Sequence, residues 1–463
     1  MPRAKKINDE KEVTSKKTTK VKVVKEKKVK ENVVKIPKVK VVKEKIAKTK
    51  TPKVKLESTK KSDGKENISN DLDSKQPQIN IGMIGHVDHG KTSLTKALTG
   101  KWCDTHSEEM KRGISIRLGY ADATFYKLKT PAGEIYSQNK NDGEIVSKRI
   151  VSFVDAPGHE TLMTTMLSGA ALMNGAVLVV AANEECPQPR TIEHLMALRF
   201  AGVKNIVVAQ NKVDLVSREE VIKNYNKIQK FLKEYNYENT PVIPTSANFN
   251  VNIDLLIDAI ETHIVTPKWD LEKPLKMYIA RSFDINKPGT EIKNLKGSVL
   301  GGSISQGVIK IGDEIEIYPG IDGKKTTSKV ISLSTNFGLI DKVTPGGLIA
   351  IGTNFDPAVG QNDRLRGKIV AKVDSLPPAV KDLTLKVTLF ERLIDVKDVT
   401  LKQNEPVVLT IGTNTGIGYI TKSTNDELKL TLKNEEIIEK GQKIAISKNI
   451  AGQWRLVAYG VVM

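Results

Sequence analysis

Residues 85–92 read Gly-His-Val-Asp-His-Gly-Lys-Thr, the GxxxxGK[ST] pattern of a phosphate-binding loop. An apolar run at residues 79–84 precedes the loop, and residues 93–98 continue with helical spacing. The glycines let backbone N–H groups face anionic oxygens, and the following helix adds the positive end of its dipole. This stretch predicts a strand, loop and helix that hold a nucleoside triphosphate, with Lys91 at the β- and γ-phosphates and the Thr92 hydroxyl on Mg²⁺. Four neighbouring residues are further candidate nucleotide contacts: Asp88, His89, Gly90 and Ser93.

A second motif, Asp155-Ala156-Pro157-Gly158-His159, follows an apolar run at residues 151–154. An aspartate at a strand end can hold Mg²⁺ through a water, which makes Asp155 a candidate for that role. The Gly158 N–H can bond a γ-phosphate only while that phosphate is present. The motif therefore predicts a segment that distinguishes a triphosphate from a diphosphate.

Two later segments indicate that the base is guanine. An apolar run at residues 206–209 leads to Asn211-Lys212-Val213-Asp214, and residues 241–245 lead to Ser246-Ala247-Asn248. The Asp214 carboxylate can accept hydrogen bonds from guanine N1 and N2, which adenine cannot donate. We expect the Ala247 N–H to meet guanine O6. In this order, after the phosphate loop, the segments predict binding of GTP and GDP.

A switch segment is expected between the phosphate loop and the second motif, at Lys111-Arg112-Gly113-Ile114-Ser115-Ile116. A hydroxyl in such a segment completes the Mg²⁺ shell while GTP is bound and is released after hydrolysis. Ser115 is the candidate for this role. From position alone, an ordinary surface serine is the alternative.

Together these motifs resemble those of a translational GTPase. More narrowly, residues 117–122 (RLGYAD), 159–163 (HETLM) and 281–290 (RSFDINKPGT) resemble the gamma subunit of archaeal and eukaryotic translation initiation factor 2. The archaeal form is the closer one, because Asp88 stands where eukaryotic relatives usually carry alanine. The resemblance covers residues 78–463.

The resemblance implies roles for single residues. His159 matches the histidine that orients the attacking water and is therefore the implied catalytic residue. Thr92 and Ser115 match the first Mg²⁺ ligands, although relatives usually carry threonine at the second position; serine retains the hydroxyl, so ligation should persist with a looser switch. Asp88 and the Gly113 carbonyl match a second Mg²⁺ position, for which a solvent-facing aspartate is the alternative.

One departure concerns zinc. Archaeal relatives usually carry four cysteines in two close pairs between the switch and the second motif, but residues 127–147 contain neither cysteine nor histidine. Zinc needs such ligands in tetrahedral number, so we expect no zinc. Turns at residues 131–134 and 139–143 should instead join short strands, with hydrogen bonds in place of the metal.

The excess positive charge is concentrated at the N-terminus. Residues 1–76 hold 25 Lys and Arg against 11 Asp and Glu and contain no aromatic residue, so they account for +14 of the net +19. Such a segment cannot bury enough surface to fold and is predicted to be a disordered basic arm. It is expected to add salt-dependent attraction to RNA, although a solubilising extension without a single partner is the alternative. The two cysteines, the lack of a signal peptide and the lack of a transmembrane run favour a cytoplasmic protein with no membrane partner.

The remaining chain predicts three domains. Residues 77–270 alternate apolar strands with helical patterns at 160–171, 191–200, 219–234 and 253–265, as in a doubly wound α/β GTP-binding domain. Short strands separated by glycine turns follow, which predicts antiparallel β-barrels at residues 271–374 and 375–463.

By resemblance, the chain is a GTPase that carries methionyl initiator tRNA to the small ribosomal subunit, as the gamma subunit of a heterotrimer with alpha and beta subunits. GTP hydrolysis then releases the factor. Arg281 or Lys287 would face the tRNA phosphates, with a solvated barrel edge as the alternative. Two other functions remain open: an elongation-type aminoacyl-tRNA carrier, against which residues 281–290 and a chain of only two barrels argue, and a non-hydrolysing GTP-binding scaffold.

Overall fold

The structure is a computed structural model that describes residues 74–103, 109, 115, 117–159, 162–322, 324–390, 400–424 and 426–463. Residues 1–73 of the expected basic arm lie outside the described residues. Of the expected switch, Ser115 is described, whereas Gly113 and its other residues lie outside the described set.

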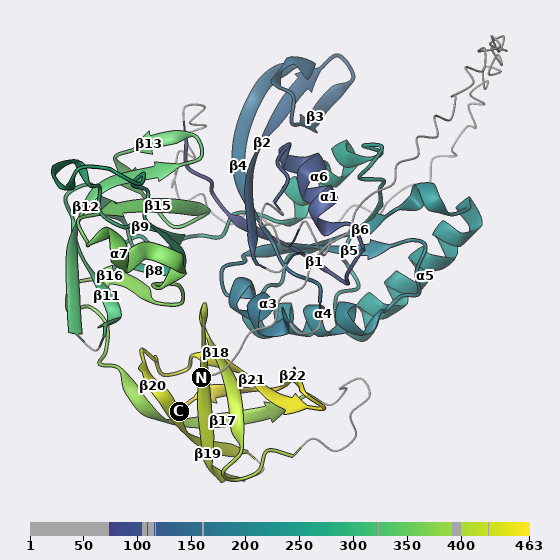
Figure 1. The fold of residues 1–463 in the computed structure, drawn as a ribbon. Helices are drawn as coiled ribbons and strands as arrows, with labels where there is room; N and C mark the ends of the chain where they lie inside the picture. The colour runs from purple at the N-terminus through teal and green to yellow at the C-terminus, as the bar shows by residue number, and fades with distance from the viewer. Residues whose placement is uncertain are drawn as a thin grey trace, which may run out of the picture. The chain divides into compact units, whose positions relative to one another are not determined.

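The predicted GTP-binding domain is built on a seven-stranded sheet in the order β3-β2-β4-β1-β5-β6-β7 (Figure 1). Strands β4, β1, β5, β6 and β7 are parallel, and β2 pairs antiparallel with both β4 and β3. The strands are β1 Asn80–Gly85, β2 Gly119–Thr130, β3 Gly133–Ser137, β4 Glu144–Asp155, β5 Gly175–Ala181, β6 Ile206–Asn211 and β7 Val242–Pro244. The parallel strands direct their carboxyl ends, and the predicted motifs that follow them, to one edge of the sheet.

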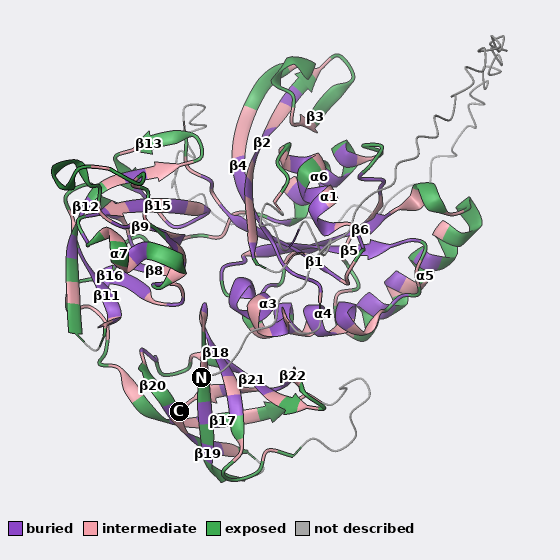
Figure 2. Ribbon diagram, in the orientation of Figure 1, coloured by how far each residue is buried: buried purple, intermediate pink, exposed green. Residues whose placement is uncertain are grey.

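Helices cover both faces of this sheet, as a doubly wound fold requires. They are α1 Lys91–Thr99, α3 Met163–Ala170, α4 Pro189–Ala201, α5 Arg218–Glu234 and α6 Ile253–His263. Leu94 of α1 and Ile257 of α6 share one buried cluster with Phe153, whereas Leu195 of α4 and Phe231 of α5 belong to the opposite one. The predicted fold class is therefore confirmed, and the buried strands are purple in Figure 2.

Residues 127–147, for which no zinc site is expected, form a hairpin extension of the sheet. Strands β2 and β4 stay paired as far as Lys129 and Glu144, and β3 adds to the outer edge. The tip is held by polar contacts: Ser137 donates to the Asp142 carboxylate, and so does the Asn139 amide at 2.8 Å. Across the described residues, no three His, Cys, Asp or Glu side chains gather where they could hold a metal ion.

Two antiparallel barrels follow, as predicted. The first is a ring of β8 Lys276–Phe283, β9 Val299–Gln306, β15 Leu348–Thr353, β12 Lys324–Thr335, β11 Glu314–Ile321 and β16 Ile369–Lys372, closed by the pairing of β11 with β12. The second is a ring of β17 Val380–Leu389, β20 Glu427–Glu436, β19 Asn414–Ser423, β18 Pro406–Ile411, β21 Lys443–Ile450 and β22 Gln453–Val462. No helix in the described part of the chain is long and apolar enough to cross a membrane.

Both barrels make specific contacts with the GTP-binding domain. Asn80 of β1 donates to Ser303 Oγ at 2.8 Å and to the Gly346 carbonyl at 3.1 Å, all in buried surroundings. Leu456 of the second barrel joins the buried cluster that contains Leu195 of α4. The GTP-binding domain is thus packed against both barrels.

Candidate functional site

The phosphate loop joins β1 to α1 through backbone conformations that few residues adopt. Asp88 and Gly90 lie in the left-handed region, with φ of 59° and 91°. A Cβ on Gly90 would lie 2.4 Å from Nδ2 of Asn211, so glycine is required there. Helix α1 begins at Lys91 without a side-chain cap, and such an end is suited to binding phosphate oxygens.

A cavity of about 360 Å³ lies over this loop. Two of its lining residues, Val87 and Trp102, were not predicted from the sequence. The other nine come from four separate predicted segments: Asp88, Gly90, Lys91, Thr92, Ser93, Ser115, Gly158, His159 and Lys212. The fold therefore assembles the phosphate-binding half of the predicted site. Trp102 has no motif around it and is recognisable only from its position in the structure, where its ring lies 5.7 Å from Lys96 Nζ.

The two hydroxyls predicted to ligate Mg²⁺ lie next to each other. Thr92 Oγ1 is 3.2 Å from Ser115 Oγ. Neighbouring oxygens on an octahedral Mg²⁺, with bonds of 2.0–2.1 Å, are separated by about 2.9 Å, so the pair is close to the required spacing. The donor set fits the ion, because oxygen is the ligand that Mg²⁺ prefers.

The second motif passes directly over the phosphate loop. Asp155 ends β4 next to Met83 of β1 and is only 1% exposed. A Cβ on Gly158 would lie 2.5 Å from Lys91 Nζ and 2.9 Å from the Val87 nitrogen. The absence of a side chain at Gly158 therefore allows this backbone to approach the place where the γ-phosphate is expected.

The imidazole of His89 does not line the cavity. It is fully buried, with Nδ1 3.0 Å from the Val179 carbonyl and Nε2 3.2 Å from the Glu184 carboxylate. The predicted nucleotide contact of His89 is consequently restricted to its backbone, because the side chain points away from the cavity and contacts Val179 and Glu184. His159, in contrast, does line the cavity, as its implied role requires.

The guanine side of the site differs from the prediction at one residue. The Asn211 amide donates to the His89 carbonyl at 3.0 Å, and its oxygen accepts the Ala247 N–H at 3.1 Å. That N–H was expected at guanine O6, but here it fixes the buried Asn211 side chain. Asp214 is exposed on the short helix Val213–Leu215, directly after β6.

Two other residues complete this side of the site. Asn248 is exposed, whereas Ser246 is only 1% exposed, and its Oγ has no hydrogen-bond partner among the described residues. A buried hydroxyl of this kind is suited to a polar ligand.

Buried histidines near the loop predict lower stability in acid. Desolvation lowers the pKa of His89 below its ordinary value of 6.5 and lowers that of His194 well below it. Below pH 6.5 the unfolded chain therefore binds protons that the folded chain does not, and stability falls with pH by up to about 1.4 kcal/mol per pH unit for each histidine. Chemical denaturation between pH 7.5 and 5 measures this loss.

The matched variant for this prediction is His194→Asn, which removes one of the titrating groups. The substitution should reduce the pH dependence of the free energy of unfolding below pH 6.5. Burial raises the pKa of Glu436 to about 7 and so contributes in the opposite direction, which makes the difference between variant and wild type the informative quantity. An identical pH dependence of the free energy of unfolding in both proteins would contradict the contribution assigned to His194.

A second cavity, of about 250 Å³, lies between the GTP-binding domain and the first barrel. Tyr120 and Asp122 line it from β2, and Arg281 and Phe283 line it from β8. Burial raises the pKa of Tyr120 to about 12, and its buried hydroxyl has no hydrogen-bond partner among the described residues. Lys287, the other cation considered from the sequence, is exposed and does not line this cavity.

Asp363 links the second cavity to the end of the switch. Its carboxylate accepts from Arg281 Nε at 2.9 and 3.0 Å and lies 3.9 Å from the guanidinium of Arg117, two residues after Ser115. The Arg281 guanidinium also stacks on Phe283, 5.2 Å from the ring centroid. Asp363 thus joins Arg117, which follows the predicted switch, to Arg281 in the wall of this cavity.

Comparisons with known proteins agree with this geometry. Residues 76–266 match the family Elongation factor Tu GTP binding domain, and residues 381–462 match Initiation factor eIF2 gamma, C terminal. Translation initiation factor 2 subunit gamma of Methanothermobacter thermautotrophicus is 50% identical over 408 residues, which is 84% of this chain and 99% of the relative. The protein of the same name from Methanocaldococcus jannaschii is 50% identical over 405 residues, which is 84% and 98% of the two chains.

Two solved structures with the same fold are elongation factors. The bacterial selenocysteine-specific elongation factor EF-Sec has a TM-score of 0.66 at 25% identity, covering 83% of this chain and 58% of that one. Translation elongation factor SelB from Methanococcus maripaludis, in complex with the GTP analogue GPPNHP, has a TM-score of 0.64 at 22% identity, covering 83% and 79%. These likenesses support the fold, whereas the 50% identities and the matched C-terminal domain decide the family. This chain is a translation initiation GTPase that belongs to the translation initiation factor 2 subunit gamma family.

Proposed function

We propose that this protein, in its GTP-bound state, carries methionyl initiator tRNA to the small ribosomal subunit as the gamma subunit of a heterotrimer with alpha and beta subunits. The observation that carries the proposal is the contact between Arg117, Asp363 and Arg281. It connects the end of the switch to a cavity between two domains. The relatives named translation initiation factor 2 subunit gamma supply the biological context.

The second cavity has the size and chemistry for the aminoacyl end of a tRNA. Its volume of about 250 Å³ accommodates one small group rather than a folded partner. Phe283 offers an aromatic face for stacking a base. Arg281 places a positive charge beside it, which suits the phosphates of the acceptor end.

In the first cavity, the proposed roles follow the positions of the side chains. Thr92 and Ser115 would hold Mg²⁺, with Asp155 acting through a water, and Asp88 with the Gly113 carbonyl would form a second Mg²⁺ position. When bound, the ion would neutralise charge on the phosphates. His159 would orient the attacking water, so that hydrolysis proceeds without a covalent intermediate and releases the factor.

The test is protection of methionyl initiator tRNA from spontaneous deacylation, compared between GTP-loaded and GDP-loaded protein in the presence of alpha and beta subunits. We expect strong protection with GTP alone and none for elongator methionyl-tRNA. Equal protection of both tRNAs would indicate an elongation-type carrier. No protection in either nucleotide state, with intact GTP binding, would indicate a scaffold.

Two cations of the same barrel provide matched variants for this experiment. Arg281→Ala removes a charge from the cavity wall and should abolish protection. Lys287→Ala removes an exposed charge outside the wall and should leave protection of the ester bond close to that of the wild type. If the two variants protect equally well, the second cavity does not hold the aminoacyl end.

A further inference from the structure

Helix α4 connects the phosphate loop to the third domain. It contacts β1 and β5 on one side and β21 of the second barrel on the other. Charged and polar residues on this helix are buried almost completely: Arg190 is 7% exposed, Glu193 4% and His194 1%. Buried polar groups need specific partners, and the partners of these residues lie in two different domains.

The first connection reaches the beginning of the phosphate loop. His194 Nδ1 accepts the Gly85 N–H at 3.1 Å. An acceptor nitrogen carries no proton, and desolvation keeps the imidazole neutral by lowering its pKa well below 6.5. Gly85 itself is confined, because a Cβ on it would lie 2.3 Å from the Val179 carbonyl oxygen. The position of His194 therefore fixes the point at which β1 turns into the loop.

The second connection reaches the third domain from the adjacent residue. Glu193 Oε1 accepts from Arg455 Nε at 2.9 Å and from a terminal nitrogen of the same guanidinium at 2.6 Å. The other oxygen of Glu193 is held by Arg190. Arg455 lies on β22, and its side chain is only 11% exposed. The two Arg455 nitrogens and Arg190 thus hold both oxygens of the buried Glu193 carboxylate by charge-assisted hydrogen bonds.

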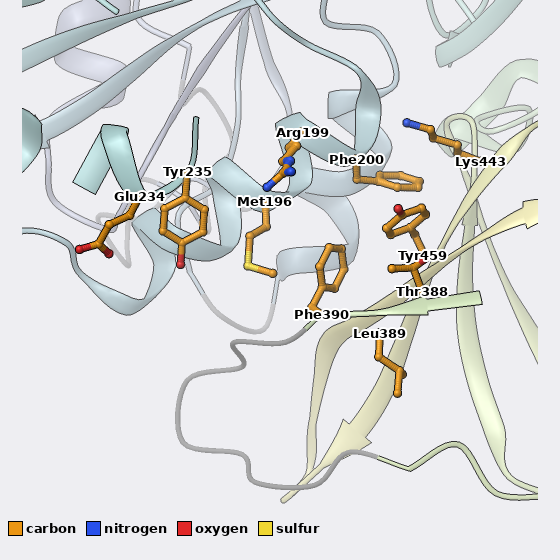
Figure 3. A pocket seen from close by; sticks show the side chains of 10 residues that line it. All are labelled: Met196, Arg199, Phe200, Glu234, Tyr235, Thr388, Leu389, Phe390, Lys443 and Tyr459. Atoms are coloured by element: carbon orange, nitrogen blue, oxygen red, sulfur yellow. The ribbon is translucent and has the colours of Figure 1, made fainter. Parts of the chain in front are cut away.

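The carboxyl end of α4 meets the same barrel through aromatic rings (Figure 3). The Phe200 ring lies 6.0 Å from that of Tyr459, which lies 5.8 Å from that of Phe390. A cavity of about 460 Å³ opens beside these rings. Packing is therefore incomplete at this end of the helix, and the contact of Glu193 with Arg455 is the more restrictive of the two.

We propose that Glu193 and His194 are positioning residues through which docking of the third domain sets the geometry of the phosphate loop. When Arg455 holds Glu193, α4 is fixed and His194 keeps the Gly85 N–H in place. When that contact is lost, α4 shifts, the hydrogen bond to Gly85 lengthens, and the nucleotide dissociates faster. The inference needs only nucleotide binding and does not depend on which tRNA the protein carries.

The test uses the full chain and the dissociation rates of fluorescent GDP and GTP. His194→Leu removes the acceptor, whereas His194→Asn keeps an oxygen at nearly the same place. Arg455→Met removes the contact with Glu193 and leaves both Glu193 and His194 in place. We expect His194→Leu and Arg455→Met each to raise the dissociation rate by about tenfold, with His194→Asn within about twofold of the wild type.

A control comes from another ion pair between domains. Lys276 of the first barrel pairs with Glu439 of the second at 2.8 Å, with side chains that are 7% and 45% exposed, and neither residue belongs to α4. Lys276→Met should lower the melting temperature without changing the dissociation rate. A similar increase in that rate would show that any loosening of the domains has the same effect, which would overturn the proposal.

The decisive measurement is the double variant of His194→Leu and Arg455→Met. If Arg455 acts through His194, the double variant releases nucleotide no faster than His194→Leu alone. If the increase in dissociation rate in the double variant equals the product of the two single increases, the proposal is overturned. If His194→Leu does not fold, Arg455→Met and Lys276→Met still decide, because equal dissociation rates in these two variants contradict a specific path through α4.

Discussion

Replacing Asp214 by asparagine is expected to lower the affinity for GTP by about 10³-fold and to raise the affinity for xanthosine triphosphate. In the proposed complex, the carboxylate accepts hydrogen bonds from guanine N1 and N2. An asparagine amide would set a donor against one of these donors, whereas the oxygen of xanthine at that position can accept the amide proton. Asp214 is exposed beside Lys212, whose left-handed backbone (φ 62°) begins the short helix.

This substitution should not disturb the fold, because the neighbouring Asn211 provides the structural contacts to His89 and Ala247. Titration with both nucleotides measures the change, and Asp258→Asn on the exposed face of α6 serves as the control. Unchanged GTP affinity in the Asp214→Asn protein would disprove the assignment of base recognition to this residue.

Local sequence patterns were sufficient to predict the loop, its strand and its helix. Glycine at residue 90 is dictated by a left-handed φ and by the amide of Asn211, and lysine and threonine follow at fixed spacing. The position of Gly158 in the same cavity could also be predicted, because its motif follows β4, whose carboxyl end lies at the same sheet edge as that of β1. Ser115 directly follows no strand that the structure describes, and only its position between the two motifs indicated it.

Features that depend on long-range pairing could not be predicted. Strand β4 begins at Glu144, well before the apolar run at 151–154, because its polar first half pairs with β2. The burial of His89 depends on Val179 and Glu184, which are about 90 positions away in the sequence. The use of the Ala247 N–H by Asn211 likewise depends on two loops meeting in space. Periodicity and motif spacing carry no information on such contacts.

Replacing Thr92 by valine is the second change with a large expected effect. Valine has nearly the same shape, so the helix and its packing should persist, but the hydroxyl beside Ser115 is lost. We expect the affinity for GTP in the presence of Mg²⁺ to fall by at least about 100-fold, because loss of a direct ligand costs no less than loss of a supporting residue. The rate of GTP hydrolysis should fall together with this affinity.

The comparison with and without metal separates ligation from damage to the loop. With Mg²⁺ chelated, Thr92→Val and wild type should bind GTP with equal affinity, because Lys91 and the loop backbone remain. Ser115→Ala should also lower the affinity for GTP in the presence of Mg²⁺. Ser115→Thr should retain Mg²⁺-dependent binding because the hydroxyl is kept. If the Thr92→Val defect is equally large without Mg²⁺, the 3.2 Å contact between the two hydroxyls supports the loop rather than the ion.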